Sequence, residues 1–366
     1  MAVTEADVMA ALSRVPDPNT GKDLVSGKAV RGVRLQPGEG GAVVALQVEL
    51  GYPARSQLQP IRQAAVEAVS ALPGVARVDA DVTQRIAAHT VQRGLKLLPQ
   101  VRNIIAVASG KGGVGKSTTA VNLALALAAE GASVGMLDAD IYGPSQPTML
   151  GITGKPESLD GKTLEPMVGH GLQASSMGFL IDPDQPMVWR GPMVTQALEQ
   201  LLNQTNWKDL DYLVVDMPPG TGDIHLTLAQ KIPVTGAVVV TTPQDIALMD
   251  AGKGLRMFEK VGVPILGIVE NMAIHVCSNC GHAEHIFGAG GGERMAAKFG
   301  VDYLGALPLD IRIREQADSG RPTVVAEPDG LLAQEYKRIA RRIAVRIADM
   351  GKDMSLKFPT IKVQNT

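Results

Sequence analysis

Residues 104–119 read IIAVASGKGGVGKSTT, and this stretch is the strongest indication of the fold of the larger part of the chain. Its first letters form a run rich in Ile and Val, which is typical of a buried parallel strand. A glycine-rich turn follows, and the alanine- and leucine-rich segment after it predicts a helix that runs through Glu130. A strand, a tight turn and a helix in this order form the basic unit of an α/β fold.

The turn matches the phosphate-binding pattern G-x-x-x-x-G-K-[ST]. Glycines let backbone N–H groups surround phosphate oxygens, and the start of the following helix adds its positive dipole end. In such loops the lysine reaches the β- and γ-phosphates and the hydroxyl binds Mg²⁺. The residues expected to bind a nucleotide here are Gly110, Lys111, Gly112, Gly113, Val114, Gly115, Lys116, Ser117 and Thr118.

The same letters admit a second interpretation. Gly110, Gly112 and Gly115 also satisfy the dinucleotide-binding pattern G-x-G-x-x-G, and Asp138 lies at about the distance expected for a ribose-binding acid. This interpretation does not explain why Lys-Ser follows the last glycine. It also leaves the acidic loop that begins at Asp216 without a role. We therefore favour the phosphate loop of an NTPase.

Two acidic loops are the candidate switches of this site. Asp216 ends a β-rich run and opens the sequence DMPPGTGD, so its carboxylate is placed to orient Mg²⁺. The backbone N–H of Gly220, in the same loop, can approach a γ-phosphate. The second loop, DADIYGPS, contains Asp138 and Asp140. Aspartates at such positions also cap helices, which is the alternative interpretation.

Composition limits the classes of function. The 366 residues carry a net charge of -2 and are 45% hydrophobic, which allows two domains with full cores. The near-neutral charge and an aromatic content of 3% argue against binding to nucleic acid. No apolar run is long enough to span a bilayer, and the N-terminus lacks a signal pattern. We expect a cytoplasmic protein without stable membrane insertion.

Strands and helices alternate over residues 101–350, which predicts a mostly parallel sheet covered on both faces by helices. Ligands of such sheets bind at the carboxyl ends of the strands, where the motifs fall. After the first strand and helix, the predicted strands are 134–137, 212–215, 236–241, 265–269 and 303–307, and the predicted helices are 192–204, 222–231, 245–260, 291–299 and 330–349. A polar tail, 351–366, follows this domain.

A separate small α+β domain is expected over residues 1–85, and residues 86–100 are interpreted as a linker. The alternation of apolar and polar residues and the turn signals predict its elements. They are a helix over 4–14, strands over 30–35 and 42–50, a helix over 57–72 and a strand over 75–82.

The chain has two cysteines, Cys277 and Cys280, in one C-x-x-C pair. In a reducing compartment this spacing indicates a metal or redox site. Four ligands normally close a zinc site or an iron–sulfur cluster, and one chain offers two thiolates. A two-fold dimer would supply four, which is the interpretation we favour. The alternatives are a redox dithiol and an intrachain zinc site completed by His275, His282 or His285.

The sequence KGGVGKST, residues 111–118, resembles the deviant phosphate loop of MinD/ParA-class ATPases. Together with DADIYGPS, DMPPGTGD and the C-x-x-C-G-H sequence, it closely resembles the Mrp (ApbC-type) iron–sulfur cluster carrier ATPases over roughly residues 101–350. The resemblance implies a cytosolic bacterial homodimer that binds and slowly hydrolyses ATP with Mg²⁺. It also implies an iron–sulfur cluster shared by two chains, received from assembly scaffolds and passed to apo-proteins. We expect a 4Fe–4S cluster, with 2Fe–2S as the alternative.

The resemblance implies roles for single residues as well. In a nucleotide-sandwich dimer, Lys111 would reach the phosphates of the partner subunit. Asp140 would position the attacking water, and Asp138 would help to hold the Mg²⁺ shell. Asn271 would read the edge of adenine, with a polar turn as the alternative. The expected catalytic residues are therefore Lys111, Lys116 and Asp140, and the expected metal ligands are Cys277, Cys280, Ser117, Asp138 and Asp216.

The N-terminal domain resembles the PaaD-like domain of metal–sulfur cluster biosynthesis. The likeness rests on Asp17-Pro18, Asp23-Leu24-Val25 and Leu72-Pro73-Gly74-Val75. This domain contains no cysteine, so it cannot bind a cluster through thiolates of its own. A docking or scaffolding role is therefore expected, with a packing domain as the alternative.

The C-terminal helix suggests an alternative function for the chain. Its apolar stripe includes Leu332, Tyr336 and Ile339, and basic residues lie mainly on its other faces. MinD-like ATPases can dock on membranes through such a helix, so a regulatory or membrane-positioning ATPase with a structural zinc is the alternative. We favour a helix that packs on the sheet, because no Trp or Phe marks the stripe and a polar tail follows.

Overall fold

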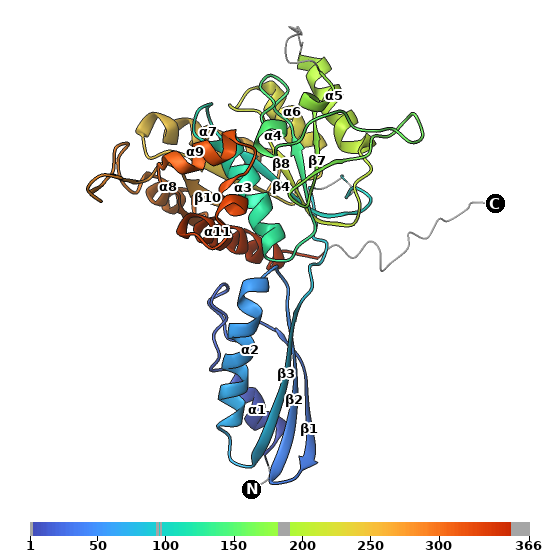
Figure 1. Ribbon diagram of the computed structural model, residues 1–366, viewed down its shortest axis with the longest axis vertical. Helices are drawn as coiled ribbons and strands as arrows, with labels where there is room; N and C mark the ends of the chain where they lie inside the picture. Colours follow the sequence, from blue (N-terminus) through green and yellow to red (C-terminus); the bar gives the residue numbers. More distant parts are fainter. Residues whose placement is uncertain (1–2, 93–94, 96, 182–190, 353–366) are drawn as a thin grey trace, which may run out of the picture. The chain divides into compact units, whose positions relative to one another are not determined.

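The computed structural model describes residues 3–92, 95, 97–181 and 191–352. The chain forms two compact units (Figure 1). The smaller unit comprises Met1–Ile86 with Ala129–Gly131, and the larger comprises Ala87–Ala128 with Ala132–Thr366. Most of the polar tail, residues 353–366, lies outside the described residues.

The smaller unit is an α+β fold, as predicted. Strand β2 pairs antiparallel with β1 and parallel with β3. Alternate residues of β2, from Val44 to Leu50, are buried, and α1 and α2 cover this face of the sheet (Figure 1). Thr4 and Asp7 cap α1 reciprocally. The elements are α1 (Glu5–Leu12), β1 (Val30–Gly38), β2 (Gly41–Leu50), α2 (Arg55–Ser70) and β3 (Val75–Gln84).

The larger unit contains an eight-stranded sheet in the order β13-β10-β9-β4-β8-β5-β7-β6. Every neighbouring pair is parallel except β6 with β7 at one edge. The mostly parallel sheet is therefore confirmed. Its strands are β4 (Val101–Ala108), β5 (Val134–Asp138), β6 (Met167–Gly169), β7 (Leu172–Ser176), β8 (Leu210–Asp216), β9 (Gly236–Thr241), β10 (Ile265–Glu270) and β13 (Tyr303–Ala306).

Helices cover both faces of this sheet. On β4, Ile104 and Ala106 pack in a cluster with α5, α6 and α7, whereas Ile105 and Val107, which point to the opposite face, are equally buried. Figure 1 shows α3 and α11 together on one side of the sheet. The helices are α3 (Lys116–Ala129), α4 (Gln146–Met149), the 3₁₀ helix η1 (Met177–Phe179), α5 (Gly191–Gln204), α6 (Asp223–Lys231), α7 (Asp245–Lys260), α8 (Gly291–Phe299), α9 (Ile311–Asp318), α10 (Thr323–Ala326) and α11 (Leu331–Ala348).

The apolar stripe of α11 is buried in the larger unit. Leu332, Tyr336, Ile339 and Ile343 are each less than one tenth exposed, and the helix packs against β10 and β13. The prediction that this helix packs on the sheet is confirmed. Among the described residues, no helix is both long and apolar enough to cross a membrane.

The described part of the predicted linker also packs into the larger unit. His89 and Gln92 are buried, and the Gln92 side-chain amide donates to the carbonyls of Ala229 and Ile232 at 2.9 and 3.3 Å. Residues 93, 94 and 96 lie outside the described residues.

Candidate nucleotide site and cysteine hairpin

The phosphate loop joins the end of β4 to the start of α3. Gly113 and Gly115 both have φ of +80°, a left-handed conformation that favours glycine. Gly110 meets a different constraint, because a Cβ there would lie 2.2 Å from the backbone carbonyl carbon of Asp250 in α7. The glycines are therefore required by backbone conformation at two positions and by a close helix contact at a third.

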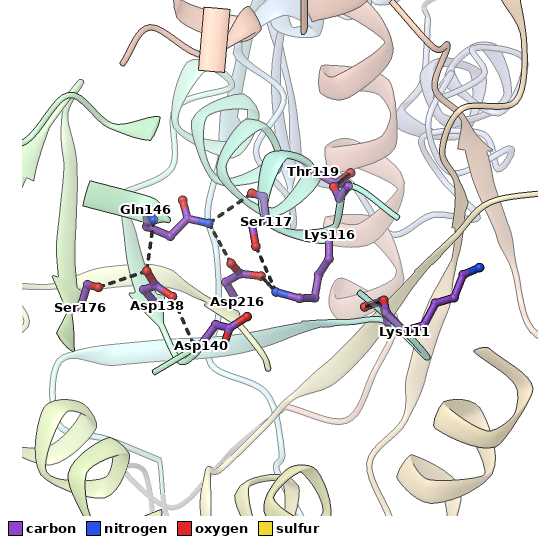
Figure 2. A network of polar contacts seen from close by, with 11 residues as sticks. Lys111, Lys116, Ser117, Thr119, Asp138, Asp140, Gln146, Ser176 and Asp216 are labelled. Carbon is purple, nitrogen blue, oxygen red and sulfur yellow. Dashed lines mark hydrogen bonds and ion pairs between the residues drawn. The ribbon is translucent and has the colours of Figure 1, made fainter. Parts of the chain in front are cut away.

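Lys116 belongs to a cluster of hydrogen-bonded polar side chains beside this loop (Figure 2). Its Nζ forms a buried ion pair with Asp216, at the carboxyl end of β8, and donates to the Ser117 hydroxyl at 3.1 Å. The structure thus brings together three residues that the sequence assigned to one site, although Lys116 and Asp216 are 100 positions apart.

Asp138, at the end of β5, is buried beside Asp216. Its carboxylate accepts from the Ser176 hydroxyl at 3.1 Å, and from the backbone N–H groups of Gln146 at 3.1 Å and Asp140 at 3.2 Å. Burial, with a smaller contribution from the charge of Asp216, raises the pKa of Asp138 to about 7. Burial also raises the pKa of Asp140.

The raised pKa of Asp138 makes stability depend on pH. The folded protein binds this proton more tightly than the unfolded chain, where the ordinary value is 3.8. In nucleotide-free, Mg²⁺-free buffer, the free energy of unfolding should therefore fall as pH rises from 4 toward about 7. Asp138→Asn should remove this part of the pH dependence and exceed the wild type in stability at pH 8. Urea unfolding of both proteins at pH 5 and pH 8 measures it, and an identical pH dependence in both would contradict it.

Gln146, at the start of α4, is a site residue that sequence reasoning missed. Its side-chain amide donates to Asp216 Oδ2 at 2.9 Å and to the backbone carbonyl of Ser117 at 3.2 Å, while its own N–H donates to Asp138. One residue thus connects both acidic loops to the phosphate loop (Figure 2). No local pattern marks it, because the partners of its side chain, Ser117 and Asp216, are 29 and 70 positions away in the sequence.

The donor set fits a magnesium ion. The Ser117 hydroxyl and the carboxylates of Asp138 and Asp216 are hard oxygen ligands, which Mg²⁺ prefers. After burial, repulsion from the Asp216 charge is the second cause of the raised pKa of Asp138, and a divalent cation would relieve this repulsion. We assign these three residues to the ion as a proposal.

Two groups that the sequence predicts to bind phosphate, the Gly220 N–H and the Lys111 side chain, are directed elsewhere in this structure. The Gly220 N–H donates to the Ser109 carbonyl at 3.1 Å, so it would have to leave this partner to reach a γ-phosphate. The side chain of Lys111 points away from the Lys116 cluster (Figure 2). Its direction is compatible with a role toward a partner subunit, which stays a prediction.

Asn271 follows β10 and is buried against the phosphate loop. Its side-chain Nδ2 donates to the Val114 carbonyl at 2.9 Å. A Cβ at Gly115 would lie 2.2 Å from the same nitrogen, so the loop and the amide are in close contact. The predicted role of Asn271 in reading adenine is not tested by this contact.

The cysteine pair lies on a small hairpin formed by β11 (His275–Val276) and β12 (Ala283–Glu284). Cys280 is exposed and Cys277 is half-buried. Backbone N–H groups of Cys280 and Asn279, together with the Cys280 thiol, lower the pKa of Cys277. Thiolates are the metal-binding form of cysteine, so the turn favours ligand chemistry.

Two of the three hairpin histidines, His275 and His285, are oriented by hydrogen bonds from Nδ1 to backbone carbonyls. The Nδ1 atom of His275 donates to the Leu309 carbonyl at 3.0 Å, and that of His285 to the Ala273 carbonyl at 2.6 Å. Among the described residues, no three His, Cys, Asp or Glu side chains are grouped so that they could hold a metal ion. The intrachain zinc alternative therefore has no support in this geometry.

Comparison with known proteins assigns the family. A family model described as NUBPL iron-transfer P-loop NTPase matches residues 100–344. The chain belongs to this family. A second model, described as an iron–sulfur cluster assembly protein, matches residues 5–82. Membership among the iron-transfer P-loop NTPases confirms the predicted family and favours the cluster-carrier interpretation over the regulatory ATPase.

Relatives of this iron-transfer NTPase are named as carriers or transfer proteins of iron–sulfur clusters. An iron–sulfur cluster carrier protein of Pseudomonas fragi is 60% identical over 75% of this chain and 96% of its own length. One of Escherichia coli (strain K12) is 54% identical over 84% of both chains. The mouse iron–sulfur cluster transfer protein NUBPL is 53% identical over 70% of this chain and 82% of its own length.

Solved structures agree on the fold. A nucleotide-binding protein of Archaeoglobus fulgidus in complex with ADP is 37% identical, with a TM-score of 0.56 over 63% of this chain and 90% of its own. The cell division ATPase MinD of Pyrococcus furiosus is 23% identical, with a TM-score of 0.50 over 66% of this chain and 98% of its own. The second likeness shows the P-loop fold alone.

Proposed function

We propose that this chain is an ATP-hydrolysing carrier of iron–sulfur clusters that works as a homodimer in the cytoplasm. Cys277 and Cys280 of two subunits would hold one cluster, expected to be 4Fe–4S, and pass it to apo-proteins. The observation that carries this proposal is the cysteine hairpin in a chain of the iron-transfer family. It presents two accessible thiols, and the described residues of one chain supply no third ligand beside them.

The nucleotide site supports ATP hydrolysis. Lys116 would bind the β- and γ-phosphates once it leaves Asp216, and the loop N–H groups would hold the phosphate oxygens. Asp140, whose pKa is raised by burial, would accept a hydrogen bond from the attacking water and orient it. Lys111 would complete the site from the partner subunit. Bound Mg²⁺, held through Ser117, Asp138 and Asp216, would neutralise phosphate charge.

The smaller unit is proposed to dock cluster-assembly scaffolds or recipient proteins. It matches the model of an iron–sulfur cluster assembly protein over residues 5–82, and both cysteines of the chain lie outside it. A docking role uses the fold of that family without requiring a cluster of its own.

Anaerobic reconstitution with iron and sulfide tests the carrier function. Absorption spectra and iron content should show about one cluster per two chains, as four thiolates from two C-x-x-C pairs require. Cys277→Ala/Cys280→Ala should lose the cluster, whereas the matched variant Ser278→Ala, in the same turn, should keep it. Sedimentation should show the loaded protein as a dimer. Zinc retained by a monomer, without cluster absorption, would contradict the proposal and support the structural-zinc alternative.

A further inference from the structure

The nucleotide site and the cysteine pair are joined by one short segment. We call residues 271–277 the connecting segment. It begins directly after β10, at Asn271, and ends at Cys277 in the hairpin. Each part of it makes a hydrogen bond to a different neighbour, so it can be followed from one site to the other.

The first end of the connecting segment is fixed to the phosphate loop. Asn271 Nδ2 donates to the Val114 carbonyl at 2.9 Å, and the Asn271 backbone N–H donates to the Thr241 carbonyl at 2.7 Å. Asn271 is buried, and its amide fills the space beside Gly115. A change in the backbone of the loop must therefore move this side chain or break its hydrogen bond.

The middle of the segment is held in an unusual conformation. Met272 has φ of +57°, which non-glycine residues seldom adopt and which neighbouring contacts must stabilise. The Ala273 N–H donates to the Leu307 carbonyl at 3.0 Å, immediately beyond this residue. Such a turn has little freedom to absorb a movement at Asn271, so the movement passes along the chain.

The far end is hydrogen-bonded to the two histidines that flank β12, His282 and His285. The Ala273 carbonyl accepts from His285 Nδ1 at 2.6 Å, and the Cys277 N–H donates to the His282 carbonyl at 2.9 Å. Because a carbonyl can only accept, the Nδ1 atom of His285 must carry its proton. The hairpin is thus anchored to a residue two positions from Asn271.

We propose that Asn271 is a positioning residue for the cysteine pair. Nucleotide binding at the phosphate loop shifts Asn271, and the connecting segment transmits this shift to Cys277 and Cys280. Through this contact the nucleotide regulates how the thiols are presented. The biological meaning rests on the proposed carrier function, but the coupling itself is a property of the cluster-free chain.

Thiol alkylation tests this coupling without a cluster. The rate of iodoacetamide modification of Cys277 and Cys280 is measured in the full chain with and without saturating ADP. We expect ADP to change the wild-type rate by about fivefold or more, as allosteric coupling commonly does. Asn271→Asp removes the donor to Val114, so its rate should respond little to ADP at concentrations shown by titration to saturate it. Sedimentation of the same samples checks that the proteins being compared have the same oligomeric state with and without ADP.

A second pair of variants separates coupling from nucleotide binding. His285→Ala removes the anchor at Ala273, so it should bind ADP like the wild type and lose the ADP-dependent change in alkylation rate. His282→Ala, in the same hairpin, keeps its backbone bond to Cys277 and should behave like the wild type. The proposal is overturned if ADP leaves the wild-type rate unchanged, or if both Asn271→Asp and His285→Ala retain the full response. Failure of cluster reconstitution would instead count against the carrier function.

Discussion

Lys116→Ala should lower the free energy of unfolding of the nucleotide-free protein by about 3–5 kcal/mol. The Lys116 and Asp216 side chains are only 6% and 0% exposed, so removing the ammonium leaves a buried carboxylate without its partner. Asp138, a second buried carboxyl group, lies beside it and adds repulsion. ATP hydrolysis should fall by about 10²–10³-fold or more, because Lys116 is the residue that we propose to stabilise charge on the transferred phosphate. Urea unfolding and phosphate release measure the two effects.

Two further variants separate stability from hydrolysis. Lys116→Met/Asp216→Asn replaces the ion pair by neutral groups of similar size, so it should recover most of the stability while hydrolysis stays lost. Lys111→Ala should change stability by less than about 0.5 kcal/mol, because its side chain points away from the cluster, yet it should lose hydrolysis if it acts across a dimer. If Lys116→Ala is as stable and as active as the wild type, Lys116 has neither the stabilising nor the catalytic role that we assign to it.

Among glycine-to-alanine substitutions in the phosphate loop, Gly110→Ala should lower the stability of the protein most. Its Cβ would lie 2.2–2.4 Å from backbone atoms of Asp250 and Ala251, and a helix backbone cannot move aside as a flexible side chain can. Either α7 separates from the loop or the loop leaves its conformation. We expect a loss of about 3 kcal/mol or more in unfolding free energy, together with loss of ATP binding.

Gly112→Ala is the matched control for this substitution. The same methyl group at Gly112 would lie 3.9 Å from the nearest atom, the Cβ of Pro219, which is an ordinary contact distance. Its unfolding free energy should therefore remain near that of the wild type. Equilibrium unfolding and nucleotide titration of both variants make the comparison. Equal stability of Gly110→Ala and Gly112→Ala would show that the contact with α7 does not constrain the loop.

The predicted elements of the larger unit were those with strong local patterns. The buried runs that became β4, β8, β9 and β10 are rich in Val and Ile. Strand β7, residues Leu172–Ser176, was not predicted because its sequence, LQASS, contains no such run. It becomes a strand because β5 offers a parallel partner. Strand β6 depends in turn on β7.

The phosphate loop, the two acidic loops and the cysteine pair could be found from the amino-acid sequence, because each motif meets its chemical requirement within a few neighbouring residues. The contacts between these motifs depend on how the folded chain packs. Gln146 joins the acidic loops, and Asn271 meets Val114 across 157 positions of sequence. The spacing of residues in a motif indicates which chemical groups a short backbone turn can bring together. It does not indicate which distant side chain packs beside that turn, because this depends on the packing of the sheet. The same packing places the nucleotide site one short segment away from the cysteines.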